Sequence, residues 1–185
     1  MSAADLSERL RGIFPPVVTN FDAAGDIAPI PFRENLRRWV ETPIDGIVLF
    51  GSNGEGALLD EDEKARLTGF AREVVPAGYL LIAGAAGEST RAAIRECRRL
   101  GAEGADAVLV HPPGYFGPYL PVAALMDYFR AVADESPVPV VIYHIPKYTK
   151  VSLEPGFVGE LARHQNVVGL KDSSGDMKRF ADYTT

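Results

Sequence analysis

The sequence predicts an α/β fold built on a parallel sheet. Short apolar segments alternate with amphipathic segments, and the expected strands start about 27 to 34 residues apart, the length of one βα unit. Several strands, such as residues 46–50 and 139–143, are continuous apolar runs. Such runs are typical of strands that helices cover on both faces.

Six strands are expected in this pattern: Ile13–Thr19, Gly46–Phe50, Leu80–Gly84, Ala107–His111, Val138–Tyr143 and Val167–Lys171. Acidic residues 60–63 open the helix after the second strand, because negative charge is favourable at a helix N-terminus. Ser89 or Thr90 caps the next helix, which ends near Gly101. Further helices are expected over about residues 121–134 and from about residue 154 onward.

Two architectures fit alternating βα units: a doubly wound open sheet and a (β/α)₈ barrel. The residues suited to chemistry follow the carboxyl ends of several strands, as in a barrel. A barrel needs eight units and about 250 residues, whereas these 185 residues supply about six units. We therefore expect residues 1–185 to form one domain that is C-terminally incomplete, either a truncated piece or one completed from elsewhere.

Composition excludes several classes of function. The net charge is −6, from 19 basic and 25 acidic residues, and no basic cluster suggests nucleic-acid binding. No apolar run approaches the roughly 18 residues that span a bilayer, so no membrane association is expected. The single cysteine, Cys97, cannot form an internal disulfide, which favours a cytoplasmic location, and we expect it to pack in the core.

Lys171 and Tyr143 each end an expected strand. A lysine in such a partly buried place is available as a neutral amine, the nucleophile that condenses with ketones to form an imine. The alternative is that Lys171 extends outward to a carboxylate such as Asp172. A tyrosine hydroxyl can donate or accept a proton, but Tyr143 taken alone fits a core tyrosine with a structural hydrogen bond better.

The loop after the second strand carries Gly51, Ser52 and Asn53. Glycine lets the backbone approach a ligand, and the two polar side chains add hydrogen-bond donors, so the loop suits a small carboxylate or phosphate. It lacks the spacing of a P-loop and is weak evidence for a dinucleotide.

The three histidines show no metal-ligand spacing, and we expect neither a metal nor a cofactor. His111 and His144 are expected either to face the mouth of the barrel or to make structural hydrogen bonds. Neither has a carboxylate at the fixed spacing of a catalytic dyad. His164 is expected at the surface, near the end of a helix.

From Arg11 to Thr185 the sequence resembles the dihydrodipicolinate synthase / N-acetylneuraminate lyase superfamily. Five motifs in order carry the resemblance: Gly51-Ser52-Asn53-Gly54-Glu55, Ala83-Gly84 with Glu88-Ser89-Thr90, Pro113-Gly114-Tyr115, Tyr143-His144-Ile145-Pro146 and Gly169-Leu170-Lys171-Asp172. It implies a (β/α)₈ TIM barrel with a C-terminal helical extension, assembled as a homo-oligomer, usually a tetramer.

The resemblance also implies roles for the matching residues. Lys171 would form the imine with the carbonyl of pyruvate, and Tyr143 would relay protons. Ser52 and Asn53, beside Gly51, would hold the carboxylate of this small 2-oxo acid substrate. Tyr115 would complete a hydroxyl relay across a subunit interface.

Within the superfamily, the motifs look most like those of 4-hydroxy-2-oxoglutarate aldolases, in which the position of Ser173 contacts substrate. The synthase of lysine biosynthesis carries an arginine where this chain has Tyr148, which argues against that activity. Sugar-acid aldolases and dehydratases remain alternatives. Two other classes stay open: a catalytically inactive truncated fragment, and an open flavodoxin-like sheet that binds a phosphorylated ligand at Gly51–Gly56.

Overall fold

A computed structural model describes residues 3–85 and 87–184. Its centre is one parallel sheet with the strand order β1-β2-β3-β4-β5. The strands are β1 (Gly46–Leu49), β2 (Leu80–Ala85), β3 (Ala107–Val110), β4 (Val140–His144) and β5 (Val167–Asp172). Neighbours in space are therefore neighbours in sequence, as in successive βα units of a barrel.

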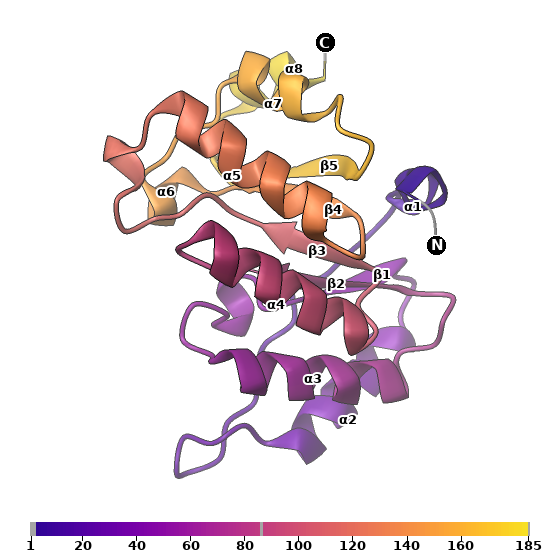
Figure 1. Cartoon of the computed structure of the whole chain (residues 1–185). Helices are drawn as coiled ribbons and strands as arrows, with labels where there is room; N and C mark the ends of the chain where they lie inside the picture. The colour runs from indigo at the N-terminus through magenta and orange to yellow at the C-terminus, as the bar shows by residue number, and fades with distance from the viewer. Residues whose placement is uncertain (1–2, 86, 185) are drawn as a thin grey trace.

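The helices pack on both faces of the sheet: most of them follow a strand and cover the outer face, whereas the N-terminal helix packs against the inner face (Figure 1). They are α1 (Ala3–Arg9), α2 (Pro29–Val40), α3 (Glu61–Val74), α4 (Thr90–Ala102), α5 (Val122–Glu135), α6 (Pro146–Thr149), α7 (Pro155–Leu161) and α8 (Met177–Tyr183), with two 3-10 turns, η1 (Ser52–Gly54) and η2 (Gly117–Tyr119). No helix in the described part of the chain is long and apolar enough to cross a membrane.

The helix starts agree with the sequence signals. Asp60 accepts a hydrogen bond from the backbone of Glu63, whose side chain accepts one from the backbone of Asp60, a complete capping box. Ser89 caps α4 by accepting from the backbone of Ala92. Each cap fixes the start of a helix that follows a strand, α3 after β1 and α4 after β2. Each cap therefore also fixes the end of the loop between that strand and its helix.

The prediction that Ile13–Thr19 forms the first strand is wrong. Within this segment only Pro16 forms a parallel bridge to Val48. Val17 N donates to Val48 O, and Val48 N donates to Pro15 O, each with a donor–acceptor distance of 3.0 Å. Pro15 and Pro16 have no N–H, so the ladder cannot continue along this segment. The described residues accordingly form five strands instead of six.

Side chains alternate between two apolar layers. The inner layer, on the concave side of the sheet, includes Val48, Ile82, Leu109, Val141 and Tyr143, with Leu6 of α1 packed against it. The outer layer lies between the strands and the helices, and it includes Ile47, Leu81, Val108, Ile142 and Cys97. The strand position of a residue therefore decides whether its side chain faces the interior or the helices.

Cys97 packs in the outer layer, as expected, and is fully buried. Burial raises the pKa of its thiol to about 12. The thiol is therefore neutral near pH 7, which argues against a nucleophilic role.

Candidate active site

Lys171 and Tyr143 lie opposite each other in the ladder between β4 and β5. Lys171 Nζ is 4.3 Å from the centroid of the Tyr143 ring, close enough for a cation–π contact. Tyr143 is buried and Lys171 half-buried. The structure therefore brings together the two residues that the sequence singled out for chemistry.

A register shift in the ladder creates this juxtaposition. Val140 pairs with Val167, an offset of 27 residues, but Val141 pairs with Gly169, an offset of 28. Without the shift, Tyr143 would lie opposite Leu170 and not Lys171. Bulges of this kind commonly redirect side chains beside active sites.

Ser52 and Gly51 reach the same place from the end of β1. Ser52 Oγ lies 3.4 Å from Tyr143 Oη, and either hydroxyl can donate. A methyl carbon added at Gly51 would lie 3.7 Å from Lys171 Nζ. Ser52 thus lies beside the hydroxyl of Tyr143 and the Lys171 amine lies over its ring, with the backbone of Gly51 beside the amine.

The turn that presents Gly51 and Ser52 is tightly constrained. Phe50 has a φ of 56°, in the left-handed region that bulky residues rarely adopt. A Cβ added at Gly56 or Gly84 would lie 2.1 or 2.4 Å from Phe50 O. Only glycine leaves room for the Phe50 carbonyl at both positions, so close backbone packing holds this unusual turn.

A cavity of about 380 Å³ opens at the carboxyl ends of the strands, a size that suits a small-molecule ligand. Its lining comprises Phe50, Gly51, Ser52, Glu55, Gly56, Ala57, Leu58, Gly84, Glu88, Leu109, His111, Gly114, Tyr143, Ile145, Tyr148 and Thr149. None of these described lining residues is a lysine or arginine. Lys171 lines a neighbouring cavity of about 510 Å³ on the concave side, which shares Leu109 with the first.

Glu88 joins two of the loops around the cavity. Its carboxylate accepts hydrogen bonds from Gly114 N, 3.1 Å from each oxygen, and from Tyr115 N at 3.0 Å. The loop after β2 thereby holds the loop after β3. The sequence placed Glu88 in a motif but did not predict this role, because the contact spans 26 residues and depends on the parallel order of the strands.

Besides Lys171, which lines the neighbouring cavity, three expected site residues lie outside the lining of the first cavity. Asn53 is exposed on η1. Tyr115 is 81% exposed, and its ring packs edge-on against Phe116 at 4.8 Å between centroids. Ser173 is exposed and donates its backbone N–H to His144 O over 2.8 Å. The substrate contacts of Asn53 and Ser173 and the relay role of Tyr115 remain predictions.

His111 fits both expected alternatives, because it faces the mouth and also makes a structural hydrogen bond. It lines the cavity, with its ring 6.5 Å from that of Tyr143 and its Nδ1 2.8 Å from Pro112 O. His164 is half-buried, not fully at the surface. Its Nε2 lies 2.9 Å from Asp134 Oδ1, and its Nδ1 accepts from Asn166 N.

His144 has a carboxylate partner that no local spacing in the sequence indicates. Its Nδ1 lies 2.8 Å from Asp172 Oδ1, on the helix-covered face of the sheet and not in the mouth. The partner comes from the next strand, 28 residues away, so no local spacing could reveal it. Asp172 points away from Lys171, which removes the alternative in which Lys171 extends outward to that carboxylate.

The described residues contain no group of three or more His, Cys, Asp or Glu side chains placed to hold a metal ion. The polar groups gathered at the strand ends are instead an amine, two hydroxyls and backbone amides. Such a set can bind a small anion and exchange protons with it.

The family model described as "Dihydrodipicolinate synthetase family" matches residues 9–185. The 4-hydroxy-tetrahydrodipicolinate synthase of Mycobacterium leprae is 35% identical over 173 residues, which cover 94% of this chain and 57% of that protein. A protein of Emericella nidulans named "Probable 4-hydroxy-2-oxoglutarate aldolase, mitochondrial" is 34% identical over 170 residues, 89% of this chain and 55% of its own length.

Solved structures agree with these relatives. A dihydrodipicolinate synthase from Bacillus anthracis superposes with a TM-score of 0.87 at 27% identity, over 93% of this chain and 59% of that one. YagE of E. coli K12, a member of the dihydrodipicolinic acid synthase family, was solved in complex with pyruvate. It superposes with a TM-score of 0.88 at 30% identity, over 94% of this chain and 58% of that one. The chain spans somewhat more than half the length of these proteins, and its sheet is part of their TIM barrel.

We predict that the change Gly84→Ala will lower the free energy of unfolding by about 1–3 kcal/mol, because the added methyl overpacks against Phe50 O. Urea denaturation measures the effect. The matched control is Gly159→Ala in α7, where an added Cβ meets nothing within 4 Å and alanine should stabilise the helix by about 0.5–1 kcal/mol. Equal stabilities of the Gly84→Ala variant and the unchanged protein would contradict the tight-turn interpretation.

Proposed function

The chain belongs to the dihydrodipicolinate synthetase family, and on this premise we propose that it is a Schiff-base (class I) aldolase or lyase acting on pyruvate-type 2-oxo acids. The observation that carries the proposal is the contact of the Lys171 amine with the face of Tyr143, whose hydroxyl lies 3.4 Å from Ser52. A nucleophile and a proton carrier meet there beside a cavity of ligand size.

The chemistry begins with the Lys171 amine. Its nitrogen attacks the ketone carbon of the 2-oxo acid, and loss of water from the resulting carbinolamine gives a protonated imine. This imine withdraws electrons, so it stabilises the carbanion that remains when the C3–C4 bond of the substrate breaks and an aldehyde leaves. Protonation of that carbanion and hydrolysis of the imine release pyruvate and restore the amine.

Tyr143 moves the protons that these steps need. Its hydroxyl can take a proton from one reacting oxygen or carbon and return it to another, with Ser52 as the next hydroxyl in line. The loop Gly51–Ser52 would hold the carboxylate of the keto acid through backbone N–H groups and the serine hydroxyl. Asn53 would join this contact through a change of its side-chain rotamer.

Tyr115 fits a role in an assembled protein. It lies in an exposed apolar segment with Phe116, Tyr119 and Val122, whose exposed fractions are 64%, 85% and 69%. Exposed apolar clusters of this kind mark interaction surfaces. We propose that this segment is buried in a homo-oligomer, a tetramer as the resemblance implies, where Tyr115 extends the hydroxyl relay of a neighbouring subunit.

For the substrate we propose 4-hydroxy-2-oxoglutarate, which would be cleaved to pyruvate and glyoxylate, with Ser173 contacting the bound molecule. The motifs support this choice, and one relative carries the name of such an aldolase. Lysine-pathway synthesis is the second candidate, because other relatives carry the synthase name. Against it, Tyr148 lines the cavity where that synthase has arginine, and tyrosine cannot make the paired contacts of a guanidinium with a carboxylate.

Lys171 should be labelled when the protein is treated with pyruvate and borohydride, which reduces the imine to a stable amine. Peptide mass spectrometry locates the adduct. The change Lys171→Ala should abolish it, whereas Lys178→Ala, on the exposed surface of α8, should leave it unchanged. Folded protein without any adduct would support the alternative of an inactive fragment.

The change Tyr143→Phe should slow formation of the trapped adduct by about 10²–10⁴-fold, the usual contribution of general acid–base catalysis. It removes only the hydroxyl, so the far-UV circular dichroism should not change. A matched control is Tyr79→Phe, which removes a hydroxyl bonded to Val40 O far from the cavity. Similar rates for both variants would refute a proton-carrying role for Tyr143.

The substrate is tested by measuring pyruvate release from 4-hydroxy-2-oxoglutarate and from sugar-derived 2-keto-3-deoxy acids, and pyruvate consumption in the presence of aspartate semialdehyde. We expect 4-hydroxy-2-oxoglutarate to react with the highest kcat/KM. Faster reaction with either competitor would overturn this choice and leave the imine mechanism intact.

A further inference from the structure

A second polar pair lies directly behind the proposed site. His144 and Asp172 are the next partners in the β4–β5 ladder after Tyr143 and Lys171. Because successive side chains of a strand point to opposite faces, this pair lies on the helix-covered face. The proposed mechanism gives it no role.

The pair is deeply buried and well aligned. The His144 and Asp172 side chains are 1% and 5% exposed, and His144 Nδ1 lies 2.8 Å from Asp172 Oδ1. A carboxylate oxygen accepts, so Nδ1 carries the hydrogen and donates it. The other ring nitrogen, Nε2, is buried without a hydrogen-bond partner in the described part of the chain. Leaving a buried polar atom unsatisfied is unfavourable, so packing alone does not account for a histidine here.

Asp172 is the centre of a network that holds the end of β5. It accepts hydrogen bonds from Ser174 N at 3.1 Å and from Ser174 Oγ at 2.8 Å. Burial by itself would raise the pKa of Asp172, but the hydrogen bonds from Ser174 and His144 outweigh burial and hold that pKa below its usual value. The carboxylate is therefore ionised near pH 7, as the network requires.

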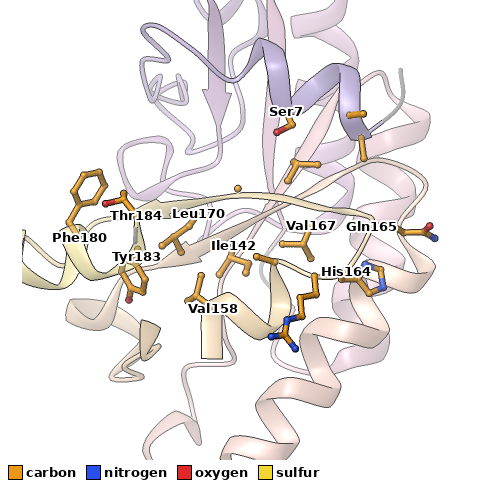
Figure 2. Close-up of a pocket in the computed structure, with 16 residues that line it drawn as sticks. Ser7, Ile142, Val158, His164, Gln165, Val167, Leu170, Phe180, Tyr183 and Thr184 are labelled. Carbon is orange, nitrogen blue, oxygen red and sulfur yellow. The ribbon is translucent and has the colours of Figure 1, made fainter. Parts of the chain in front are cut away.

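The last helix covers the pair from outside. The Tyr183 hydroxyl donates to Leu153 O and lies 3.2 Å from His144 Nδ1. Figure 2 shows Tyr183 extending from α8 toward the outer face of β5, beside Leu170. The pair thus connects both strands to the helix that follows them.

The strand that carries Lys171 needs such a connection. All six residues of β5 are only half-buried, whereas β1 to β4 are fully buried. The ladder contains two offsets, 27 and 28 residues. If the offset of 27 continued to the strand ends, Tyr143 would face Leu170 and His144 would face Lys171. Only the offset of 28 places His144 opposite Asp172.

We infer that His144 and Asp172 are positioning residues, which select the β4–β5 register that holds the Lys171 amine against Tyr143. Their hydrogen bond forms only in the register that also forms the catalytic pair. Because residues 143 and 144, and residues 171 and 172, are adjacent in the chain, fixing the outer pair fixes the inner one. This inference rests on the proposed function for its catalytic consequence but not for its geometry.

Two substitutions of His144 test its hydrogen bond to Asp172 separately from the polarity of its side chain. The change His144→Asn keeps a donor close to the position of Nδ1, whereas His144→Gln moves its amide out to the position of Nε2, away from Asp172. The pyruvate trapping rate at Lys171 is measured for both at saturating pyruvate. We expect His144→Gln to slow it by about tenfold to a hundredfold, the cost of misplacing a reacting group by about 1 Å, and His144→Asn to stay close to the unchanged protein.

The pyruvate concentration for half-maximal trapping should change little in either variant, because the loop Gly51–Ser52, proposed to hold the carboxylate, follows β1 and not β4 or β5. The control Ile142→Val alters the same face of β4 without touching the network, and its trapping rate should equal that of the unchanged protein. Equal rates for the Gln and Asn variants, or an equal loss in Ile142→Val, would overturn the inference in favour of a purely structural role.

A second measurement does not depend on pyruvate. Reductive methylation with formaldehyde and cyanoborohydride, followed by peptide mass spectrometry, gives the reactivity of Lys171 relative to exposed Lys178. His144→Gln should change that ratio at least severalfold and His144→Asn should not. If the unchanged protein forms no pyruvate adduct, the proposed function fails, and the methylation ratio still decides whether His144 positions Lys171.

Discussion

The register between β4 and β5 is the constraint on which the rest of the site depends. A shift of one residue at Val140/Val141 changes the pairing offset and brings Tyr143 opposite Lys171. One residue is the smallest change a ladder allows, yet it exchanges an apolar partner for an amine. The amine–ring contact of 4.3 Å follows from it, and so does the pair on the opposite face.

The other parts of the site depend on close backbone packing. The turn after β1 holds Phe50 in a left-handed conformation, and Gly56 and Gly84 leave room for its carbonyl. That turn places Ser52 beside Tyr143. Strain in one residue is thus compensated by packing from the neighbouring strand, a common arrangement where a site must be rigid. The carboxyl ends of β1, β4 and β5 then present their polar groups at one edge of the sheet.

Local patterns predicted the elements well, since apolar runs and capping signals act over a few residues. The helix starts at Asp60 and Ser89 follow from side-chain hydrogen bonds to backbone groups three residues further along the chain. The segment Ile13–Thr19 has the composition of a strand, but a strand also needs N–H groups, and Pro15 and Pro16 lack them. Only Val17 and Thr19 of this segment are buried, whereas Ile13 and Val18 are 61% and 51% exposed, so composition predicted neither burial nor pairing there.

The sequence by itself determined the fold class, the strand ends and the residue types at them: an amine at Lys171, a phenol at Tyr143 and a glycine–serine loop after the second strand. The tertiary structure alone decided which of them meet. Pairing across 28 residues depends on a bulge that no local periodicity encodes, so His144 turned out to face Asp172 and not the mouth. Asn53, Tyr115 and Ser173 lie outside the cavity lining because the direction of a loop, unlike that of a strand, is set by packing between distant segments.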